Sequence, residues 1–229
     1  MGRISWMEYH RIESIDDPLF RKMHELMQKV FPPEEVLACE LWREPLADPG
    51  IRVYVAVRED EVVGATEYRY YPDLEVAMTD FTISGREGLG IGPFLAERRL
   101  SDLKATAAAM NRRLLGTFAE IYDPYQAEGL EFGGIKPMDP FVRREVLAHL
   151  GFRKLDFTYV HPSWKNDGEA VSGLDLCFMP IEHEGEELPA GLVVDFLKRY
   201  YAFLTNKPQE WLDMVERLEK RDRLKLLPI

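Results

Sequence analysis

The chain has 229 residues, of which 46% are hydrophobic and 30% are charged, and its formal net charge at pH 7 is −11. A chain of this size can bury one sizeable core and still carry an appendage. The acidic balance argues against nucleic acid as a partner, because nucleic-acid binding depends on Lys and Arg side chains that neutralise phosphates. It is compatible with a cationic ligand such as an amine.

The sequence shows neither a transmembrane run nor the apolar core of a signal peptide. We therefore expect a cytoplasmic protein with no membrane partner. Cys39 and Cys177 stand in apolar segments and are expected to be buried thiols rather than a disulfide. The five histidines are scattered without the spacing of metal ligands, so no metal site is expected.

Two amphipathic helices are expected near the N-terminus. Asp17-Pro18 is a helix-start signal, and apolar residues follow it at helical spacing over residues 19–30. Pro32-Pro33 ends that helix, and Glu34 opens a second one before Pro45. Core packing is the simplest role for this helix pair.

A β-hairpin and a further strand follow. Residues 51–57 alternate between polar and apolar, residues 58–61 form a charged turn, and residues 62–71 return as the second arm. After a turn at Pro72-Asp73, the apolar residues 76–83 have the composition of a buried or half-buried strand.

A glycine-rich segment, TISGREGLGIGPFL at residues 82–95, joins that strand to a helix. Gly88, Gly90 and Gly92 leave the loop without side chains at every second position, so successive N–H groups can converge on one point. The positive end of the following helix adds to the same concavity, and a phosphate is the natural ligand. Pro93 agrees with a helix start there, because its missing N–H would have had no partner.

From the glycines alone, two other interpretations stay open: a turn without a ligand, and a nucleotide-binding α/β protein. The glycine spacing matches neither the dinucleotide fingerprint nor the triphosphate-binding loop.

The helix that follows the glycine loop is expected to end at residues 111–113, and a strand is expected over residues 114–121. The expected apolar stripe of this helix consists of Ala96, Leu100, Leu103, Ala107 and Met110.

The C-terminal half begins with a segment, residues 122–140, that lacks regular periodicity. Loops of this length are usually functional, so we expect a lid or pocket wall, with an insertion of no functional role as the alternative. A helix over residues 141–147 and strands over residues 152–161 and 174–181 follow. After an acidic link, two further amphipathic helices are expected near residues 192–200 and 208–218.

Two motifs resemble those of the GNAT acyltransferases. Residues 87–92, EGLGIG, followed by Leu95, are similar to the Q/R-x-x-G-x-G/A loop of the family. Residues 149–154, HLGFRK, are similar to the K-L-G-F ending of the family's fourth helix. Glu87 stands where the family has Gln or Arg, with Arg86 one place early, and Leu147 stands where many members have a tyrosine that acts as general acid.

The resemblance covers roughly residues 5–180 and implies an α/β fold with a mixed, mostly antiparallel sheet flanked by helices. We expect residues 1–183 to form this domain and residues 184–229 to form a C-terminal helical extension packed on it, which covers the core or makes a homodimer contact. The implied activity is transfer of an acetyl group from acetyl-CoA to a primary amine of a small molecule or peptide, by direct attack in a ternary complex. The helix pair near the N-terminus and the loop over residues 122–140 would form the acceptor site.

Acetyl-CoA is the implied co-substrate. Its pyrophosphate would lie on the glycine loop, and its pantetheine arm would pair with the exposed main chain of residues 81–83, as an added strand does. The expected cofactor-binding residues are Phe81, Thr82, Ile83, Arg86, Glu87, Gly88, Leu89, Gly90, Ile91 and Gly92.

Direct acyl transfer to an amine needs a base, donors for the thioester carbonyl, and an acid for the leaving thiolate. Glu67, Asp80 and Glu120 are carboxylates in strand-like segments, where burial would raise the pKa toward that of a useful base. The resemblance implies that the strand over residues 114–121 is splayed from the strand before the glycine loop, which leaves a gap for the pantetheine arm. Glu120 is preferred because it ends the strand that lines this gap. Tyr122 and Tyr125, which follow on the same segment, are the candidate acids.

Each of these assignments has an alternative. The carboxylates can point outward or form salt bridges, and the tyrosines can be pocket walls. For the whole chain, the alternative to an enzyme is a non-catalytic acyl-CoA-binding or regulatory GNAT-like module.

Overall fold

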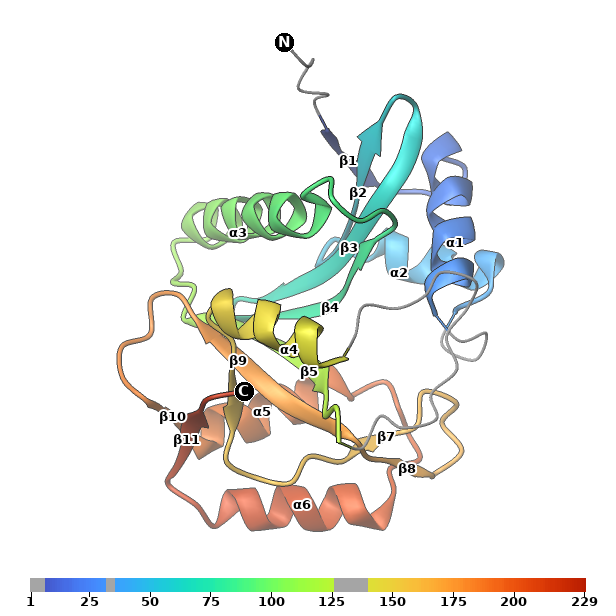
Figure 1. The fold of residues 1–229 in the computed structure, drawn as a ribbon. Coiled ribbons are helices and arrows are strands. Elements are labelled where there is room, and N and C mark those ends of the chain that lie inside the picture. The colour runs from blue at the N-terminus through green and yellow to red at the C-terminus, as the bar shows by residue number, and fades with distance from the viewer. Residues whose placement is uncertain (1–6, 32–35, 126–139) are drawn as a thin grey trace. The chain divides into compact units, whose positions relative to one another are not determined.

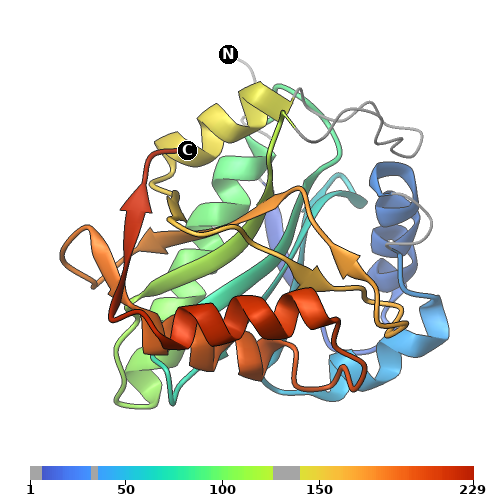
Figure 2. The same cartoon turned by 90° about the horizontal axis from the view of Figure 1, so that it is seen from below.

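The computed structural model describes residues 7–31, 36–125 and 140–229, and internal contacts divide these residues into two compact units. Of the described residues, those up to Leu114 form unit 1 and those from Leu115 onward form unit 2. Figure 1 labels the elements of both units, and Figure 2 shows the same ribbon from below.

Unit 1 is a four-stranded antiparallel sheet with helices on both faces. The sheet order is β1 (Glu8–Ile12), β2 (Ile51–Arg58), β3 (Glu61–Tyr71) and β4 (Val76–Ser84). One face carries α1 (Pro18–Val30), the 3-10 helix η2 (Cys39–Trp42) and α2 (Arg43–Ala47), and the other carries α3 (Ile91–Ala109).

Helix α1 begins at Pro18, as the Asp17-Pro18 signal predicts. Asp17 is the N-cap, and its Oδ1 accepts the N–H of Leu19 at 2.8 Å. The apolar face of α1 packs on inward-facing strand residues, and this cluster is the larger core of unit 1. It contains Ile12, Phe20, Met23, Leu26, Met27, Trp42, Val53, Val55, Val57, Ala65 and Ile83.

The second N-terminal helix differs from the prediction. Over the described part, the chain is not helical at residues 36–38 and then forms η2 and α2 instead of one helix that begins at Glu34. His24 Nε2 lies 2.8 Å from the Leu37 carbonyl oxygen, and Trp42 Nε1 donates to the same oxygen at 3.3 Å. Because side chains occupy this carbonyl, it is not available to a helical hydrogen bond.

The apolar stripe of α3 is also only partly as expected. Met110 is 52% exposed, and Ala96 and Leu100 are only half-buried. The buried face follows a strict spacing of four and includes a charged residue: Ile91, Leu95, Arg99, Leu103 and Ala107. Arg99 is tolerated there because the sheet presents hydroxyl groups to it, as described below.

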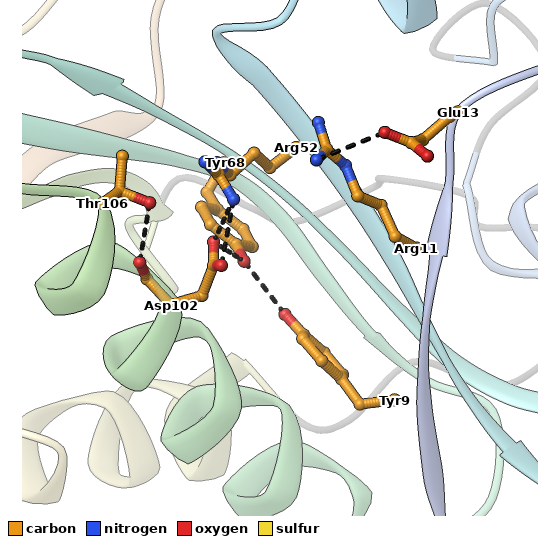
Figure 3. A network of polar contacts seen from close by, with 7 residues as sticks. All are labelled: Tyr9, Arg11, Glu13, Arg52, Tyr68, Asp102 and Thr106. Atoms are coloured by element: carbon orange, nitrogen blue, oxygen red, sulfur yellow. Dashed lines mark hydrogen bonds and ion pairs between the residues drawn. The ribbon is translucent and has the colours of Figure 1, made fainter. Parts of the chain in front are cut away.

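A polar network lies between α3 and the sheet of unit 1 (Figure 3). The Tyr68 hydroxyl donates to Asp102 Oδ2 at 2.7 Å, and Arg52 Nη1 lies 3.0 Å from both oxygens of Asp102. The hydroxyls of Tyr9 and Tyr68 are 3.2 Å apart. Burial raises the pKa of Tyr68, which therefore stays a neutral donor.

We expect Tyr68→Phe to lower the free energy of unfolding by about 1.5–3 kcal/mol, because a hydrogen bond to a charged group would be lost in a buried site. Urea unfolding measures this value. The matched comparison is a double-mutant cycle with Asp102→Asn. An equal cost of Tyr68→Phe in both backgrounds would show that the hydroxyl and the carboxylate do not interact.

Unit 2 has its own antiparallel sheet, in the order β5, β9, β6, β11, β10, and a short hairpin. The strands are β5 (Gly116–Tyr122), β6 (Arg153–Leu155), β7 (His161–Pro162), β8 (Ala170–Val171), β9 (Leu174–Pro180), β10 (Glu187–Pro189) and β11 (Arg223–Leu227). The helices are α4 (Pro140–His149), α5 (Ala190–Tyr200) and α6 (Gln209–Glu219).

The two faces of β5 pack differently. Ala119 and Ile121 belong to a cluster that includes Leu147 of α4. On the other face, the ring of Phe118 stacks on Phe196 of α5, with 4.1 Å between the ring centres. Helix α6 lies beside α5 (Figures 1 and 2). Alternating residues of β5 thus face α4 and α5 in turn.

The strand predicted over residues 152–161 is much shorter in the structure. Strand β6 ends at Leu155, because Asp156 bonds the returning chain: its Oδ1 accepts the N–H of Lys225 at 2.8 Å, and its Oδ2 accepts from Arg221 Nη2 at 2.8 Å. The C-terminal extension contains strands β10 and β11 in addition to the two predicted helices. Strand β11 pairs with β6 on one side and β10 on the other.

Candidate functional site

The glycine-rich loop after β4 alternates between packed and bare positions. Leu89 and Ile91 pack against a small apolar cluster formed with β2, β3 and α3. Between them, Gly88 and Gly90 have φ values of +74° and +66°, which favour glycine. A Cβ atom at Gly88, Gly90 or Gly92 would meet no heavy atom within 4 Å. The loop is therefore anchored on one side and presents bare, open backbone on the other.

Helix α3 begins directly at this loop. Gly90 is its N-cap and provides no side-chain hydrogen bond. Within the described residues, no acceptor bonds the N–H of Gly90, Ile91 or Gly92. These donors and the positive end of the helix dipole can stabilise an anion, and a phosphate fits best.

Two further glycines allow the loop to lie close to the sheet. A Cβ at Gly64 of β3 would collide with the side chain of Ile91 and lie 2.8 Å from the Ile83 carbonyl oxygen. A Cβ at Gly85 would lie 2.9 Å from Leu26 of α1, and the Gly85 N–H donates to the Val63 carbonyl at 2.8 Å. The loop can lie this close to the sheet because neither glycine has a side chain.

The two charged residues before the glycines point to solvent. The Arg86 guanidinium forms a salt bridge with Glu61, and both side chains are more than half exposed, at 57% and 61%. Glu87 is exposed. An open hollow adjoins the loop, lined by Lys22, Glu25, Leu26, Lys29, Glu61, Val62, Val63, Gly85 and Arg86. Its walls carry both signs of charge.

Strand β4 is irregular just before the loop. Phe81 pairs with Glu67 of β3, but Thr79 pairs with Tyr68, so Asp80 is an extra residue at a β-bulge. Bulges commonly re-aim side chains and backbone groups beside active sites. Asp80 itself is exposed.

Glu67 is a carboxyl group that the structure partly shields from water. It is half-buried and lies on the same face of β3 as Ala65, which packs in the core under α1. Burial raises the pKa of Glu67 well above its usual range, and the negative charge of Asp80 raises it further. A carboxyl group with a raised pKa can act as a base near neutral pH.

Contacts on both faces of β4 hold the strand segment of residues 81–83 in place. Arg99 Nη1 donates to the hydroxyl oxygens of Thr66 at 2.9 Å and Thr82 at 2.8 Å. Arg99 is buried, and burial lowers its pKa to about 10, so it remains charged at neutral pH. Ile83 packs into the core under α1 on the opposite face.

In unit 2, Glu120 is bonded by two tyrosines. Its Oε1 accepts from the hydroxyls of Tyr159 and Tyr201, each at 2.5 Å, and the two hydroxyl oxygens are 2.6 Å apart. Both tyrosines are buried and Glu120 is half-buried. Burial raises the pKa of both tyrosines, and the charge of Glu120 raises it further, so both hydroxyls stay protonated.

The candidate acids have different surroundings. Tyr122 is half-buried at the end of β5, with the Arg143 guanidinium 5.9 Å from its ring centre. Tyr125 is 81% exposed, and its ring lies nearly perpendicular to that of Phe141, with 5.3 Å between the ring centres. Leu147 packs in the apolar cluster of β5. The rest of the expected pocket wall, residues 126–139, lies outside the described residues.

The structure thus brings Glu67, Asp80 and Phe81 together in unit 1, and groups Glu120 with two tyrosines in unit 2. Sequence reasoning missed Arg99, Tyr159 and Tyr201. Arg99 had a detectable signal, because it occupies the same face as Leu95 and Leu103 at a spacing of four. The tyrosines had none, because they lie 42 residues apart in the chain.

The described residues contain neither a metal-binding cluster nor a membrane-spanning helix. No three His, Cys, Asp or Glu side chains there lie close enough together to hold a metal ion. No helix in that part of the chain combines the length and apolar character needed to cross a bilayer.

Comparison with known proteins identifies the fold. No protein-family profile matches the sequence, and no curated protein matches it. Solved structures do match. A Bacteroides thetaiotaomicron protein assigned to the GNAT family of acetyltransferases is 16% identical, with 87% of this chain and 98% of that chain covered and a TM-score of 0.57.

Two further structures match at similar levels. The ribosomal-protein-S18-alanine N-acetyltransferase of Escherichia coli is 12% identical, with 80% and 99% of the chains covered and a TM-score of 0.52. The PaiA N-acetyltransferase of Thermoplasma acidophilum, solved with coenzyme A, is 11% identical, with 77% and 99% covered and a TM-score of 0.51. The predicted GNAT-type α/β fold is confirmed.

Proposed function

We propose that this chain, which has the GNAT fold, transfers an acetyl group from acetyl-CoA to a primary amine. One observation carries the proposal: three glycines leave open backbone at the uncapped start of α3, in the loop that follows a bulged strand. Main-chain N–H groups at an open helix start commonly bind a phosphate, and this supports the diphosphate of acetyl-CoA as the ligand. The main chain of residues 81–83 would bind the pantetheine arm, and one neighbour of this fold was solved with coenzyme A.

In the proposed reaction, the amine nitrogen forms a bond to the acetyl carbon while the carbon–sulfur bond breaks. Glu67 takes the proton that the nitrogen loses, and the raised pKa makes it suited to this role. Asp80, beside it, keeps the pKa of Glu67 high. Main-chain N–H groups of residues 81–83 polarise the carbonyl, and the leaving thiolate takes up a proton from solvent.

A small-molecule or peptide amine is the proposed acceptor. The E. coli neighbour acts, by its name, on an alanine of a ribosomal protein. The net charge of −11 suits an acceptor that arrives as a cation. Glu67 supports an enzyme over a non-catalytic binding module, because a partly buried carboxyl group with a raised pKa, paired with Phe81 at the bulge before the glycine loop, suits a general base.

The first experiment is a thermal shift assay on the purified protein. Acetyl-CoA at about 100 times its Kd should stabilise the fold by about 2.7 kcal/mol, whereas ATP and NAD at the same concentration should not. Release of free CoA thiol with a panel of amines then tests turnover. Stabilisation without thiol release from any amine would identify the binding module, and equal stabilisation by ATP would identify a nucleotide-binding protein.

A further inference from the structure

A buried chain of hydrogen bonds leads from α3 to the bulged strand β4, and all of it lies in unit 1. Arg99 of α3 is 5% exposed, and its Nη1 donates to the hydroxyl oxygens of Thr66 at 2.9 Å and Thr82 at 2.8 Å. The Thr66 hydroxyl has one proton, and its oxygen already accepts from Arg99. This proton goes to the Phe81 carbonyl oxygen at 2.9 Å, which is nearer than the Thr82 hydroxyl oxygen at 3.4 Å.

The chain of hydrogen bonds ends on a single peptide group. The Phe81 carbonyl and the Thr82 N–H belong to the same peptide, which is trans, and in a planar trans peptide the two groups point in opposite directions. Since the Phe81 carbonyl faces Thr66 of β3, the Thr82 N–H points to the other edge of β4. That is the direction from which the proposed pantetheine arm would pair with residues 81–83.

The positive charge of Arg99 is not neutralised by a salt bridge. No carboxylate among the described residues lies within salt-bridge distance of Arg99, and Asp102, one turn later on α3, bonds Arg52 and Tyr68 instead (Figure 3). A buried charge strengthens the hydrogen bonds that it starts, because each bond in a chain polarises the next in a medium of low dielectric constant. The chain therefore withdraws electron density from the peptide at its end, whose N–H becomes a stronger donor.

We propose that Arg99 and Thr66 are positioning residues for acyl transfer. They orient and polarise the peptide group between Phe81 and Thr82, so that the Thr82 N–H stabilises the negative charge on the thioester oxygen. This inference rests on the proposed acetyl transfer and specifies which main-chain donor acts and what strengthens it. As the amine nitrogen bonds to the acetyl carbon, the carbonyl electron pair moves onto the oxygen, and it returns when the carbon–sulfur bond breaks. Arg99 and Thr66 keep their protons throughout.

The experiment compares Thr66→Val, which removes the hydroxyl, with Thr66→Ser, which keeps it, and adds Arg99→Gln, all in the full chain. Calorimetry measures the Kd of acetyl-CoA, and a single-turnover assay with the best amine of the panel measures the rate of transfer. Loss of a whole oxyanion donor costs about 10²–10³-fold in rate, and loss of a polarising partner weakens a bond by about 10–30%. We therefore expect Thr66→Val to slow transfer by about two- to eightfold, with the Kd within a factor of about two. Thr66→Ser should restore the rate, and Arg99→Gln should slow transfer more than Thr66→Val.

A second measurement does not depend on turnover. The nitrogen of a peptide group becomes less electron-poor when its carbonyl loses a hydrogen bond, so the ¹⁵N resonance of Thr82 should move upfield in Thr66→Val and Arg99→Gln but not in Thr66→Ser. Thr117→Val is the matched control, because it removes a buried strand hydroxyl that bonds a main-chain carbonyl in unit 2. It should change neither the rate nor the resonance.

A wild-type rate in Thr66→Val would overturn the inference, as would a loss of rate that Thr66→Ser does not repair. The Thr66 pair carries the test if Arg99→Gln does not fold. Failure of the proposed function looks different, because the wild-type protein would then release no thiol with any amine, and the inference would fall with it.

Discussion

Gly92→Glu should weaken acetyl-CoA binding by about tenfold or more while making the free protein slightly more stable. Gly92 is the second residue of α3, and a Cβ there meets no heavy atom within 4 Å. Glutamate is favoured over glycine in helices by about 0.5–1 kcal/mol, and its charge is favourable in the first turn. The added side chain starts from a Cβ that tilts toward the helix N-terminus, over the donors that would hold the diphosphate, so its negative charge repels the ligand.

Calorimetry with acetyl-CoA measures the affinity, and thermal unfolding of the free protein measures the stability. Gly191→Glu is the matched control, because Gly191 is the second residue of α5 and its Cβ position is equally open. It should raise stability by a similar amount without any effect on affinity. If Gly92→Glu binds acetyl-CoA as the wild type does, the diphosphate does not lie on the start of α3.

Glu67→Gln should lower kcat by about 10²–10⁴-fold, the usual contribution of a general base, while the affinity for acetyl-CoA stays within a factor of about two. The acid limb of the wild-type profile of kcat/KM against pH should lie above the ordinary glutamate value of 4.5, because burial and Asp80 raise the pKa of Glu67. Asp80→Asn removes one of these causes and should move that limb to lower pH. A larger loss of rate in Asp80→Asn than in Glu67→Gln would make Asp80 the base.

The same pKa shift gives a stability signature that does not depend on turnover. Below pH 4.5, Glu67 is protonated in both the folded and the unfolded chain, so its ionisation has no effect on stability. As the pH rises toward the folded-state pKa, the unfolded chain loses its proton first, and the folded state loses stability. Glu67→Gln should therefore become more stable than the wild type with rising pH, by about 1.4 kcal/mol per unit of pKa shift.

Local patterns predicted most of the elements. Helix α1, the hairpin of β2 and β3, strand β4 and the two helices of the extension lie close to their expected positions, because periodicity and capping act within a few residues. The errors arose where a distant side chain bonded the backbone. His24 and Trp42 contact the Leu37 carbonyl, and Asp156 bonds Lys225, which is 69 residues away.

For the candidate site residues too, local patterns were predictable and distant contacts were not. The glycine loop could be predicted because its chemistry lies in one short motif at a strand-to-helix junction. No sequence pattern explains Gly64 in the second arm of the hairpin, whereas the structure does, because a Cβ there would collide with the side chain of Ile91. The partners of Glu120 could not be predicted, because Tyr159 and Tyr201 follow it by 39 and 81 residues, with no pattern that connects them.

The position of β11 between β6 and β10 bears on how the chain folds. Short hairpins join β2 to β3 and β3 to β4 in unit 1. In unit 2, the bond of Asp156 with Lys225 of β11 and the bond of Glu120 with Tyr201 join residues that lie 69 and 81 positions apart. Contacts between distant residues slow folding, since the entropy of loop closure is lost before any contact forms. Refolding should therefore proceed in two kinetic phases, the slower of which restores the aromatic environment of Tyr201.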